Sequence, residues 1–246
     1  MPRFFIAGTN INGGMAIMKG NDAEHIHVLR LRPGDDLILC DTEGKDYKCR
    51  LVKATKTEVE AEILEVVPCT SEPTVKVSVL CGLPKGSEKT DYIIQKSVEA
   101  GANEILFFSS SRCIAKIDED GRNKKLDRWN RIAEEAAKQS GRGIIPRVEW
   151  IGDFTEALNV SIKKDLSLFM YETGPRESLK DVLDDSRDAA SIAIITGPEG
   201  GFAQFEADLA KITGCRICSM GDRILRCETA PIIALTAAMY ATGNLN

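Results

Sequence analysis

The sequence predicts an α/β protein in which a mainly parallel β-sheet carries helices on both faces, with a smaller β-domain in front of it. From residue 75 onward, strand-like apolar runs alternate with helical segments, the order typical of parallel sheets. Before residue 68 the chain instead contains short strands separated by turns. A hydrophobic content of 43% with 28% charged residues is ordinary for a globular protein, and 246 residues can form two modest domains.

The amino-terminal part predicts a small antiparallel barrel. Strand-like runs at 36–41, 46–52 and 58–64 are separated by turns at 32–35 and 42–45. Short strands at this regular spacing are typical of such barrels. We therefore expect the first domain to be a β-barrel.

A polar segment at 68–73, bracketed by two prolines, predicts a linker, so we expect domains at residues 1–70 and 74–246. The second domain opens with a strand at 75–81 and a helix near 88–100. The elements expected after them are strand 104–108, helix 127–140, strand 166–171, strand 190–196, helix 204–212, strand 215–219 and helix 229–242.

Two glycine-bearing turns stand out in the last fifth of the chain. One runs from Thr196 to Phe202 (TGPEGGF) and the other from Met220 to Pro231 (MGDRILRCETAP). Each follows an apolar run, so each leaves a strand end, where open α/β sheets bind their ligands. Glycine lets backbone groups approach a ligand without interference from a Cβ atom. The turns predict a cofactor pocket lined by backbone, with charged residues at its rim.

Composition indicates a cytoplasmic protein. The first residues lack the pattern of a signal peptide, and the longest apolar tract is too short to span a bilayer, so we expect no membrane segment. The eight cysteines are scattered, and Cys215 and Cys218 form one CxxC pair within a strand-like run. No second pair completes a zinc site, so packing is favoured over redox chemistry and no metal is expected.

Several enzyme classes lose their main support. The only histidines are His25 and His27, both in the first domain, so the second domain cannot hold a histidine-based triad. The chain has no G-x-S-x-G, P-loop or G-x-G-x-x-G motif. A backbone-lined pocket, arginines and a basic surface remain, and these suit a transferase that brings an activated donor to an RNA base.

A basic stretch lies at residues 112–147, with ten Lys and Arg against six acidic residues, although the whole chain has a net charge of −5. The acidic total argues against a protein that coats nucleic acid indiscriminately. From charge alone, a solvated helix face and a phosphate-binding surface remain equally open.

The order of motifs resembles that of the bacterial RsmE family of 16S rRNA uridine-N3 methyltransferases, in the SPOUT superfamily. Both glycine turns match the signature of that family. The resemblance extends over nearly the whole chain, with further matching segments at 2–5, 28–35, 83–86, 93–99, 111–113 and 128–140.

The resemblance implies a PUA-like barrel followed by a SPOUT domain whose carboxy-terminal chain forms a trefoil knot, and it implies a homodimer. It also implies S-adenosyl-L-methionine as cofactor and 16S rRNA in the small ribosomal subunit as partner. The positions carried over as cofactor-binding are Leu80, Gly82, Thr196, Gly197, Pro198, Glu199, Gly200, Gly201, Met220, Gly221, Ile224, Leu225, Arg226, Thr229 and Ala230.

Our catalytic hypothesis concerns three side chains at the rim. The proton on uracil N3 must leave before N3 attacks a methyl group, and a carboxylate could accept it. Arg226 is expected to stabilise the developing oxyanion, and Glu199 or Glu228 to accept the proton or orient the base. Alternatively, Glu228 only caps the last helix, because an acid is favoured at a helix start.

A set of basic side chains is expected to hold RNA phosphates, which would make affinity fall with salt. The set consists of Arg3, Arg30, Arg32, Arg112, Lys124, Lys125, Arg128 and Arg142.

The chain departs from the family pattern at two places. The segment between His25 and Val28 is one residue shorter than the pattern, which puts the family role of His25 in doubt. Cys227 stands where relatives usually have alanine, and its thiol could make the protein sensitive to alkylation unless it is buried. Two rival functions stay open, a ribose 2′-O-methyltransferase of the same superfamily and an rRNA-binding assembly factor without catalysis.

Overall fold

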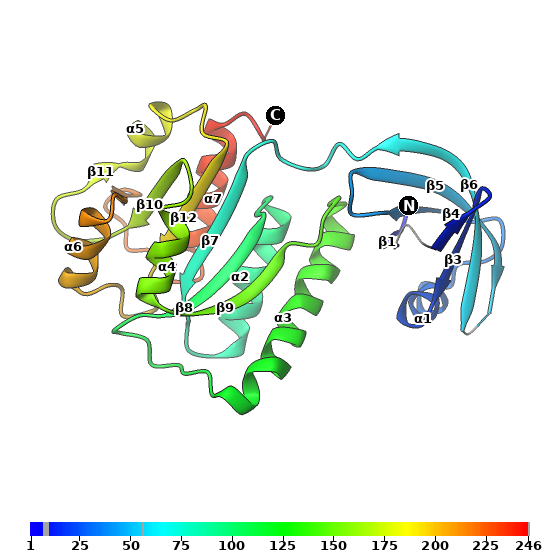
Figure 1. Ribbon diagram of the computed structural model, residues 1–246, viewed down its shortest axis with the longest axis horizontal. Helices are drawn as coiled ribbons and strands as arrows, with labels where there is room; N and C mark the ends of the chain where they lie inside the picture. The colour runs from blue at the N-terminus through cyan, green and yellow to red at the C-terminus, as the bar shows by residue number, and fades with distance from the viewer. Residues whose placement is uncertain (7–9, 56, 246) are drawn as a thin grey trace. The chain divides into compact units, whose positions relative to one another are not determined.

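The computed structural model describes residues 1–6, 10–55 and 57–245. The chain divides into two compact units, and Figure 1 traces both. The first comprises residues 1–72 with 137–145, and the second comprises 73–136 with 146–246. The short segment 137–145 therefore belongs to the first unit, although it lies far from the rest of that unit in the sequence.

The first unit is a curled six-stranded sheet with one helix. The strands are paired in the order β1-β4-β5-β6-β3-β2, and every pair is antiparallel except β1 with β4. Alternate residues such as Leu37 and Leu39 point into one core, as expected for strands with a single buried face. The elements are β1 (Arg3–Phe5), β2 (Ile11–Asn12), β3 (Met15–Lys19), α1 (Asn21–Val28), β4 (Asp36–Cys40), β5 (Lys45–Ala54) and β6 (Glu58–Pro68).

The second unit contains a seven-stranded sheet in the order β11-β13-β10-β12-β7-β8-β9, and all its strand pairs are parallel. This confirms the predicted α/β class. Its elements are β7 (Lys76–Gly82), α2 (Ser87–Glu99), β8 (Glu104–Ser109), α3 (Glu119–Ser140, whose last residues belong to the first unit), β9 (Arg147–Asp153), α4 (Phe154–Ser161), β10 (Leu166–Met170), β11 (Glu177–Ser178), α5 (Leu179–Asp184), β12 (Ser191–Thr196), α6 (Gln204–Ile212), β13 (Arg216–Ser219) and α7 (Ala230–Ala241).

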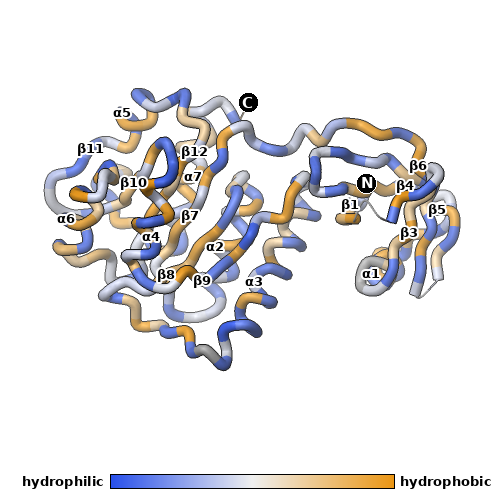
Figure 2. Tube along the Cα trace, in the orientation of Figure 1, coloured by the Kyte–Doolittle hydropathy of each residue, from blue (hydrophilic) through white to orange (hydrophobic). Residues whose placement is uncertain are grey.

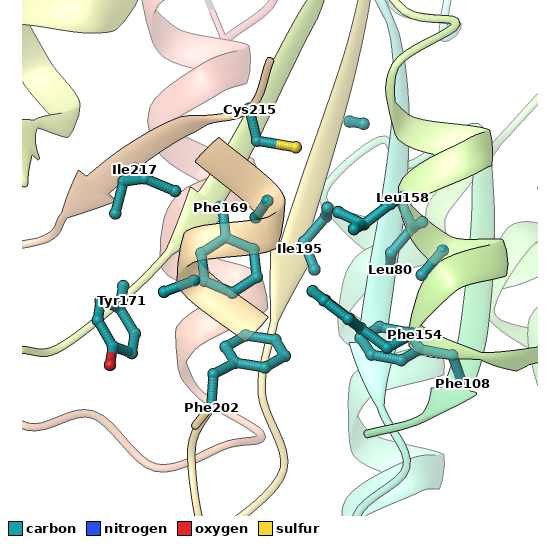
Figure 3. Close-up of a cluster of buried hydrophobic side chains, with 14 of the residues drawn as sticks. Leu80, Phe108, Phe154, Leu158, Phe169, Tyr171, Ile195, Phe202, Cys215 and Ile217 are labelled. Atoms are coloured by element: carbon teal, nitrogen blue, oxygen red, sulfur yellow. The ribbon is translucent and has the colours of Figure 1, made fainter. Parts of the chain in front are cut away.

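Both faces of this sheet are covered. Leu80 and Ile195 belong to a buried cluster that includes residues of α4 and α6 (Figure 3). The neighbouring residues Val79 and Ile194 point to the other face and are also fully buried. Helix α7 contacts β7, β12 and α2. Burial on both faces explains why these strands read as continuous apolar runs rather than as alternating patterns.

Several elements differ from the expectation. Helix α3 begins at Glu119, not near residue 127, and Asp118 Oδ1 accepts a hydrogen bond from the Gly121 N–H at 3.1 Å, as an N-cap side chain does. The helix is largely hydrophilic in Figure 2, and Gly121 interrupts its pattern. Strand β9 and helix α4 were not expected, because mixed charged and apolar residues conceal the strand.

Parallel strands place all their carboxyl ends at one edge of the sheet. The loops that follow β7, β10, β12 and β13 therefore meet at this edge, which we call the carboxyl edge. The glycine turns are two of these loops. None of the helices in the described ranges is long and apolar enough to cross a membrane.

Candidate active site

The first glycine turn follows β12 and is packed too closely for side chains. A Cβ atom on Gly197 would lie 3.1 Å from the backbone of Gly201, and Gly201 itself has a φ of +63°. The Gly201 N–H donates to Pro198 O at 2.9 Å. A Cβ atom on Gly82, at the end of β7, would lie 2.6 Å from Pro198 Cδ. The turn therefore needs glycine at these positions.

Phe202 fixes this turn to the core. Its ring is almost fully buried and lies 4.3 Å from the ring of Phe169 on β10, measured between centroids. The rings of Phe154 and Phe108 complete the cluster, as Figure 3 shows. Aromatic packing of this kind holds the glycine turn in place without occupying the space above it.

The second turn connects β13 to α7. Gly221 has a φ of +96°, and its N–H donates to Ser219 Oγ at 3.2 Å. At the other end, Arg226 O accepts hydrogen bonds from the N–H groups of Thr229 and Ala230, at 2.9 and 3.0 Å, where the chain enters α7. The Arg226 side chain is 84% exposed and stands at the rim.

The two turns line one cavity of about 410 Å³ together with the carboxyl ends of β10, β12 and β13. A cavity of this size is in the range that binds small molecules and cofactors. The residues carried over as cofactor-binding that line it are Thr196, Gly197, Pro198, Glu199, Gly201, Met220, Gly221, Ile224, Leu225, Arg226 and Ala230.

Four of the carried-over positions have other surroundings. Leu80 is buried in the core cluster, and Gly82 packs against Pro198. Gly200 lies against Arg112, whose Nη1 donates to Gly200 O at 2.9 Å. Thr229 is the N-cap residue of α7 and makes no side-chain capping bond.

Two carboxylates face one ammonium group at the rim. Lys89 Nζ, in the first turn of α2, lies 2.7 Å from Glu199 Oε1 and 4.0 Å from Glu228 Oε2. Burial opposes ionisation of Glu199, but hydrogen bonds from Lys89 and from the Lys85 N–H outweigh it and lower its pKa. Glu199 thus stays ionised near neutral pH.

Glu228 is held more loosely. Burial opposes its ionisation too, but its own backbone N–H, the Cys227 thiol and the nearby cations lower the pKa. Cys227 Sγ donates to Glu228 Oε2 at 3.2 Å, and Arg226 Nη1 lies 4.0 Å from Glu228 Oε1. Among the described residues, no hydrogen bond joins Glu228 to the first turn of α7.

The Cys227 thiol is not a reactive thiolate. Burial, followed by its hydrogen bond to Glu228, raises its pKa to about 12. Alkylation requires the thiolate, so the structure argues against the sensitivity that the sequence suggested. Cys215 and Cys218 are both buried, in agreement with packing rather than redox chemistry.

The sequence interpretation missed part of the cavity wall. Glu172 stands after β10, and its Oε1 atom lies against Gly201 so closely that a Cβ atom there would be 2.2 Å away. A strand end at 166–171 was expected, and the rule that ligands bind at such ends could have found it. The missed lining residues are Lys89, Met170, Tyr171, Glu172, Arg176, Cys218 and Ser219.

Two of the predicted phosphate-binding residues are buried and paired with acids. Arg3 Nη2 lies 2.6 Å from Asp46 Oδ1, and its side chain is only 7% exposed. Arg142 Nη2 lies 2.8 Å from Glu72 Oε2, with 4% exposed. Both guanidinium groups are therefore engaged within the first unit, and little of either side chain is exposed.

The other basic residues of the set are accessible. Arg30, Arg32, Lys124 and Lys125 are exposed. Arg128 is exposed but makes a bidentate pair with Asp91, whereas Arg112 contacts the glycine turn. His25, whose role was in doubt, packs edge-on against Phe4 at 5.6 Å between ring centroids. Within the described ranges, no cluster of three His, Cys, Asp or Glu side chains could hold a metal.

The chain combines a parallel α/β sheet, which has a glycine-lined cavity at its carboxyl edge, with a curled β-unit, and the family models assign these two parts to an RNA methyltransferase. The model of an RNA methyltransferase domain matches residues 70–239, and that of an RNA methyltransferase PUA domain matches residues 19–64.

The chain belongs to the ribosomal RNA small subunit methyltransferase E family. It is 35% identical to the Bacillus subtilis protein of that name over 228 residues, which cover 91% of this chain and 89% of the relative. It is 31% identical to the Mesomycoplasma hyopneumoniae protein over 96% of this chain and 98% of the relative.

The fold agrees with a solved structure from the same family. Ribosomal RNA small subunit methyltransferase E from Neisseria gonorrhoeae, bound to S-adenosyl methionine, aligns with a TM-score of 0.88 at 33% identity. The alignment covers 98% of this chain and 97% of that one. The chain described here is a methyltransferase by family and by fold.

Proposed function

We propose that this protein methylates N3 of a uridine in 16S rRNA of the small ribosomal subunit, with S-adenosyl-L-methionine as donor. The observation that carries the proposal is the cavity at the carboxyl edge, with Arg226 and Glu228 at its rim. The names of the relatives support small-subunit rRNA as the substrate. Assembly of that subunit takes place in the cytoplasm, where we expect the protein to act.

The residues present fit the donor. Gly197 and Gly201 line the cavity and carry no side chain, so the main chain of the first turn can approach a ligand there. The volume suits a ligand of this size. When bound, S-adenosylmethionine supplies an electrophilic methyl group. Backbone around Gly197 and Met220 would hold it, with the carboxylate of Glu172 at the wall.

The chemistry required of the protein is removal of one proton and stabilisation of one negative charge. Glu228, ionised and lightly hydrogen-bonded, would accept the N3 proton of the uracil. Arg226 is exposed beside it and would stabilise the charge that develops on a uracil oxygen. Glu199 is held by hydrogen bonds from the Lys85 N–H and from the Lys89 ammonium, which favours an orienting role for it.

RNA would contact the exposed basic residues that remain from the predicted set. Arg30, Arg32, Lys124 and Lys125 carry their charge into solvent, as phosphate contacts require. Binding of rRNA should therefore weaken as salt rises. Equal affinity at low and high salt would remove this surface from the proposal.

A second copy of the chain would complete the assembly as a homodimer. Helices α2 and α7 contact each other and expose large apolar side chains, Tyr92, Ile233 and Tyr240. Exposed apolar patches of this kind mark interaction surfaces. We also propose that the carboxy-terminal segment forms the trefoil knot implied by the resemblance. Sedimentation equilibrium of the wild type and of Tyr240→Glu tests the dimer, which the substitution should weaken.

The decisive experiment is methylation of small-subunit rRNA, both free and in assembled 30S particles, followed by mapping of the modified nucleoside. Methyl transfer to N3 of one uridine is expected. A methylated ribose would instead assign the protein to the ribose 2′-O-methyltransferases. Absence of both transfer and S-adenosylmethionine binding in calorimetry would favour the non-catalytic assembly factor.

Arg226→Ala tests the catalytic role within the same assay. It should lower kcat by a factor on the order of 100 while the Kd for S-adenosylmethionine changes little. Arg187→Ala, which removes an exposed arginine outside the cavity, is the control. Near-normal turnover by Arg226→Ala, with normal cofactor binding, would contradict the assignment.

A further inference from the structure

The loop between β7 and α2 matches the family motif at 83–86, yet no step proposed above uses it. Gly86, with a φ of +92°, turns the chain into α2. Directly before it, the Lys85 N–H donates to both carboxylate oxygens of Glu199, at 3.0 and 3.2 Å. The loop thus hydrogen-bonds Glu199, a side chain of the first glycine turn.

Lys89, in the first turn of α2, binds the same carboxylate. Its Nζ donates to Glu199 Oε1 at 2.7 Å and also faces Glu228 Oε2 at 4.0 Å. Its side chain is 34% exposed, so the ammonium lies at the cavity rather than in bulk solvent. One cation therefore faces an acid from each of the two glycine turns.

Glu199 and Glu228 receive hydrogen bonds of different kinds. Glu199 accepts from the Lys85 N–H and from Lys89, which fixes its orientation. Glu228 accepts from its own backbone N–H and from the Cys227 thiol, and its distance from Lys89 is too long for a hydrogen bond. Among the described residues, no charged group hydrogen-bonds Glu228, which keeps acceptor capacity for a reactant, whereas Lys89 holds Glu199.

We propose that Lys89 is a positioning residue of this active site. It holds Glu199 as an ionised link between the β7–α2 loop and the first glycine turn, and it leaves Glu228 ionised but free to take the uracil proton. This inference rests on the function proposed above. Lys89 acts through the two carboxylates and is not itself assigned a contact with the substrate.

Removal of the ammonium should change both acids. In Lys89→Met two neighbouring carboxylates lose their shared cation, so one of them becomes harder to ionise. Arg226 and the neutral Cys227 thiol are the other groups that face Glu228, and Arg226 is only 4.0 Å away at the exposed rim. Arginine at position 89 keeps the charge, so Lys89→Arg should restore most of the function.

The experiment compares Lys89→Met with Lys96→Met. Lys96 lies on the same helix, has a similar exposed fraction and is paired with Glu99 instead. We expect Lys89→Met to lower kcat by between about 10-fold and 100-fold, with KM and the Kd for S-adenosylmethionine nearly unchanged. The acidic limb of its pH–rate profile should move to higher pH, and Lys96→Met should match the wild type in every respect.

A readout independent of catalysis separates this inference from the proposed function. Carbon-13 NMR of labelled glutamate side chains, assigned with Glu228→Gln, follows the titration of Glu228 in the free protein. In Lys89→Met the pKa of Glu228 should rise relative to the wild type. An unmoved titration, or a loss of cofactor affinity equal to the loss of kcat, would overturn the role of Lys89. A wild-type protein that transfers no methyl group would overturn the proposed function instead.

Discussion

Glu104 and Glu228 lie at opposite edges of the same parallel sheet, and both are mostly buried, with 13% and 16% of their side chains exposed. Glu104, the first residue of β8, accepts hydrogen bonds from Ser78 at 2.6 Å, Arg147 at 2.7 Å and Lys164 at 3.1 Å. Ser78 and Arg147 are its register partners on β7 and β9. Glu228 accepts from its own backbone N–H and from the weakly donating Cys227 thiol, and the cations Lys89 and Arg226 lie 4.0 Å away.

The difference shows that burial alone does not define a functional acid. Burial opposes ionisation of Glu104, but its three donors outweigh that effect and lower its pKa to about 2. Such a carboxylate has no free acceptor and contributes stability. Glu228 keeps acceptor capacity and opens onto a cavity. Partly satisfied acids at strand ends are therefore the better candidates for catalysis.

The largest expected effect is the loss of activity in Glu228→Gln, which tests whether Glu228 is the functional acid of the two. The amide cannot accept the uracil proton as a carboxylate does, so kcat should fall by a factor on the order of 100 or more. The free energy of unfolding should change little, because few bonds are lost. Methylation kinetics and urea denaturation measure the two quantities, with Glu104→Gln as the reference from the other edge. Wild-type kcat in Glu228→Gln would refute its catalytic assignment.

Glu104→Gln should show the reverse pattern. The amide cannot satisfy a lysine and an arginine together, so the free energy of unfolding should drop by about 3 kcal/mol at pH 7. The kcat of the folded protein should stay close to that of the wild type. Urea denaturation provides the measurement, and unchanged stability would mean that the hydrogen bonds at Glu104 contribute nothing net.

The dependence of stability on low pH is a further test of the role of Glu104. The folded pKa of Glu104 is about 2, below its ordinary value of 4.5. Its contribution to stability is therefore fully present above pH 4.5 and is lost as the pH falls toward 2. Stability of the wild type should fall more steeply over this window than that of Glu104→Gln. Parallel curves, followed by circular dichroism in urea at each pH, would exclude Glu104 as a source of acid sensitivity.

The smallest effect is expected from Arg147→Met. Arg147 is 60% exposed, and solvent screens its pair with Glu104, so the loss of stability should stay below about 1 kcal/mol. Lys164→Met should cost more, because Lys164 is only 23% exposed. The midpoints of urea denaturation rank the two variants, and the opposite order would show that exposure does not control these pairs.

Much of the fold was predictable because the signals were local. The alternation of apolar runs with helical segments predicted the parallel sheet, and helix α6 has the predicted bounds. Strand β9 was not predictable in the same way, since an edge strand with Arg147 and Glu149 need not be apolar. Helix α4 had a usable signal, because Asp153 caps it by accepting from the Glu156 N–H.

In the site, too, residues with a local sequence signal were predictable and residues positioned by distant contacts were not. Glycines at strand ends marked both turns, since only glycine tolerates the approach seen at Gly197 and Gly201. Lys89 gave no signal, because its two acidic partners lie more than a hundred residues away in the sequence. The pairing of Arg3 with Asp46 gave no signal for the same reason, since it appears only when the fold brings β1 and β5 into one sheet.

The strand order also determines when the active site can form during synthesis. β7 gains β8 as a neighbour early, but its other neighbour is β12, where Thr196 pairs with Cys81 across 115 residues. Contacts of such long separation slow folding, because a large loop must close before they form. One edge of β7 therefore stays unpaired on the ribosome until the last third of the chain emerges. A chain whose synthesis stops before β12 would therefore have an unpaired, aggregation-prone edge on β7 rather than a partly active site.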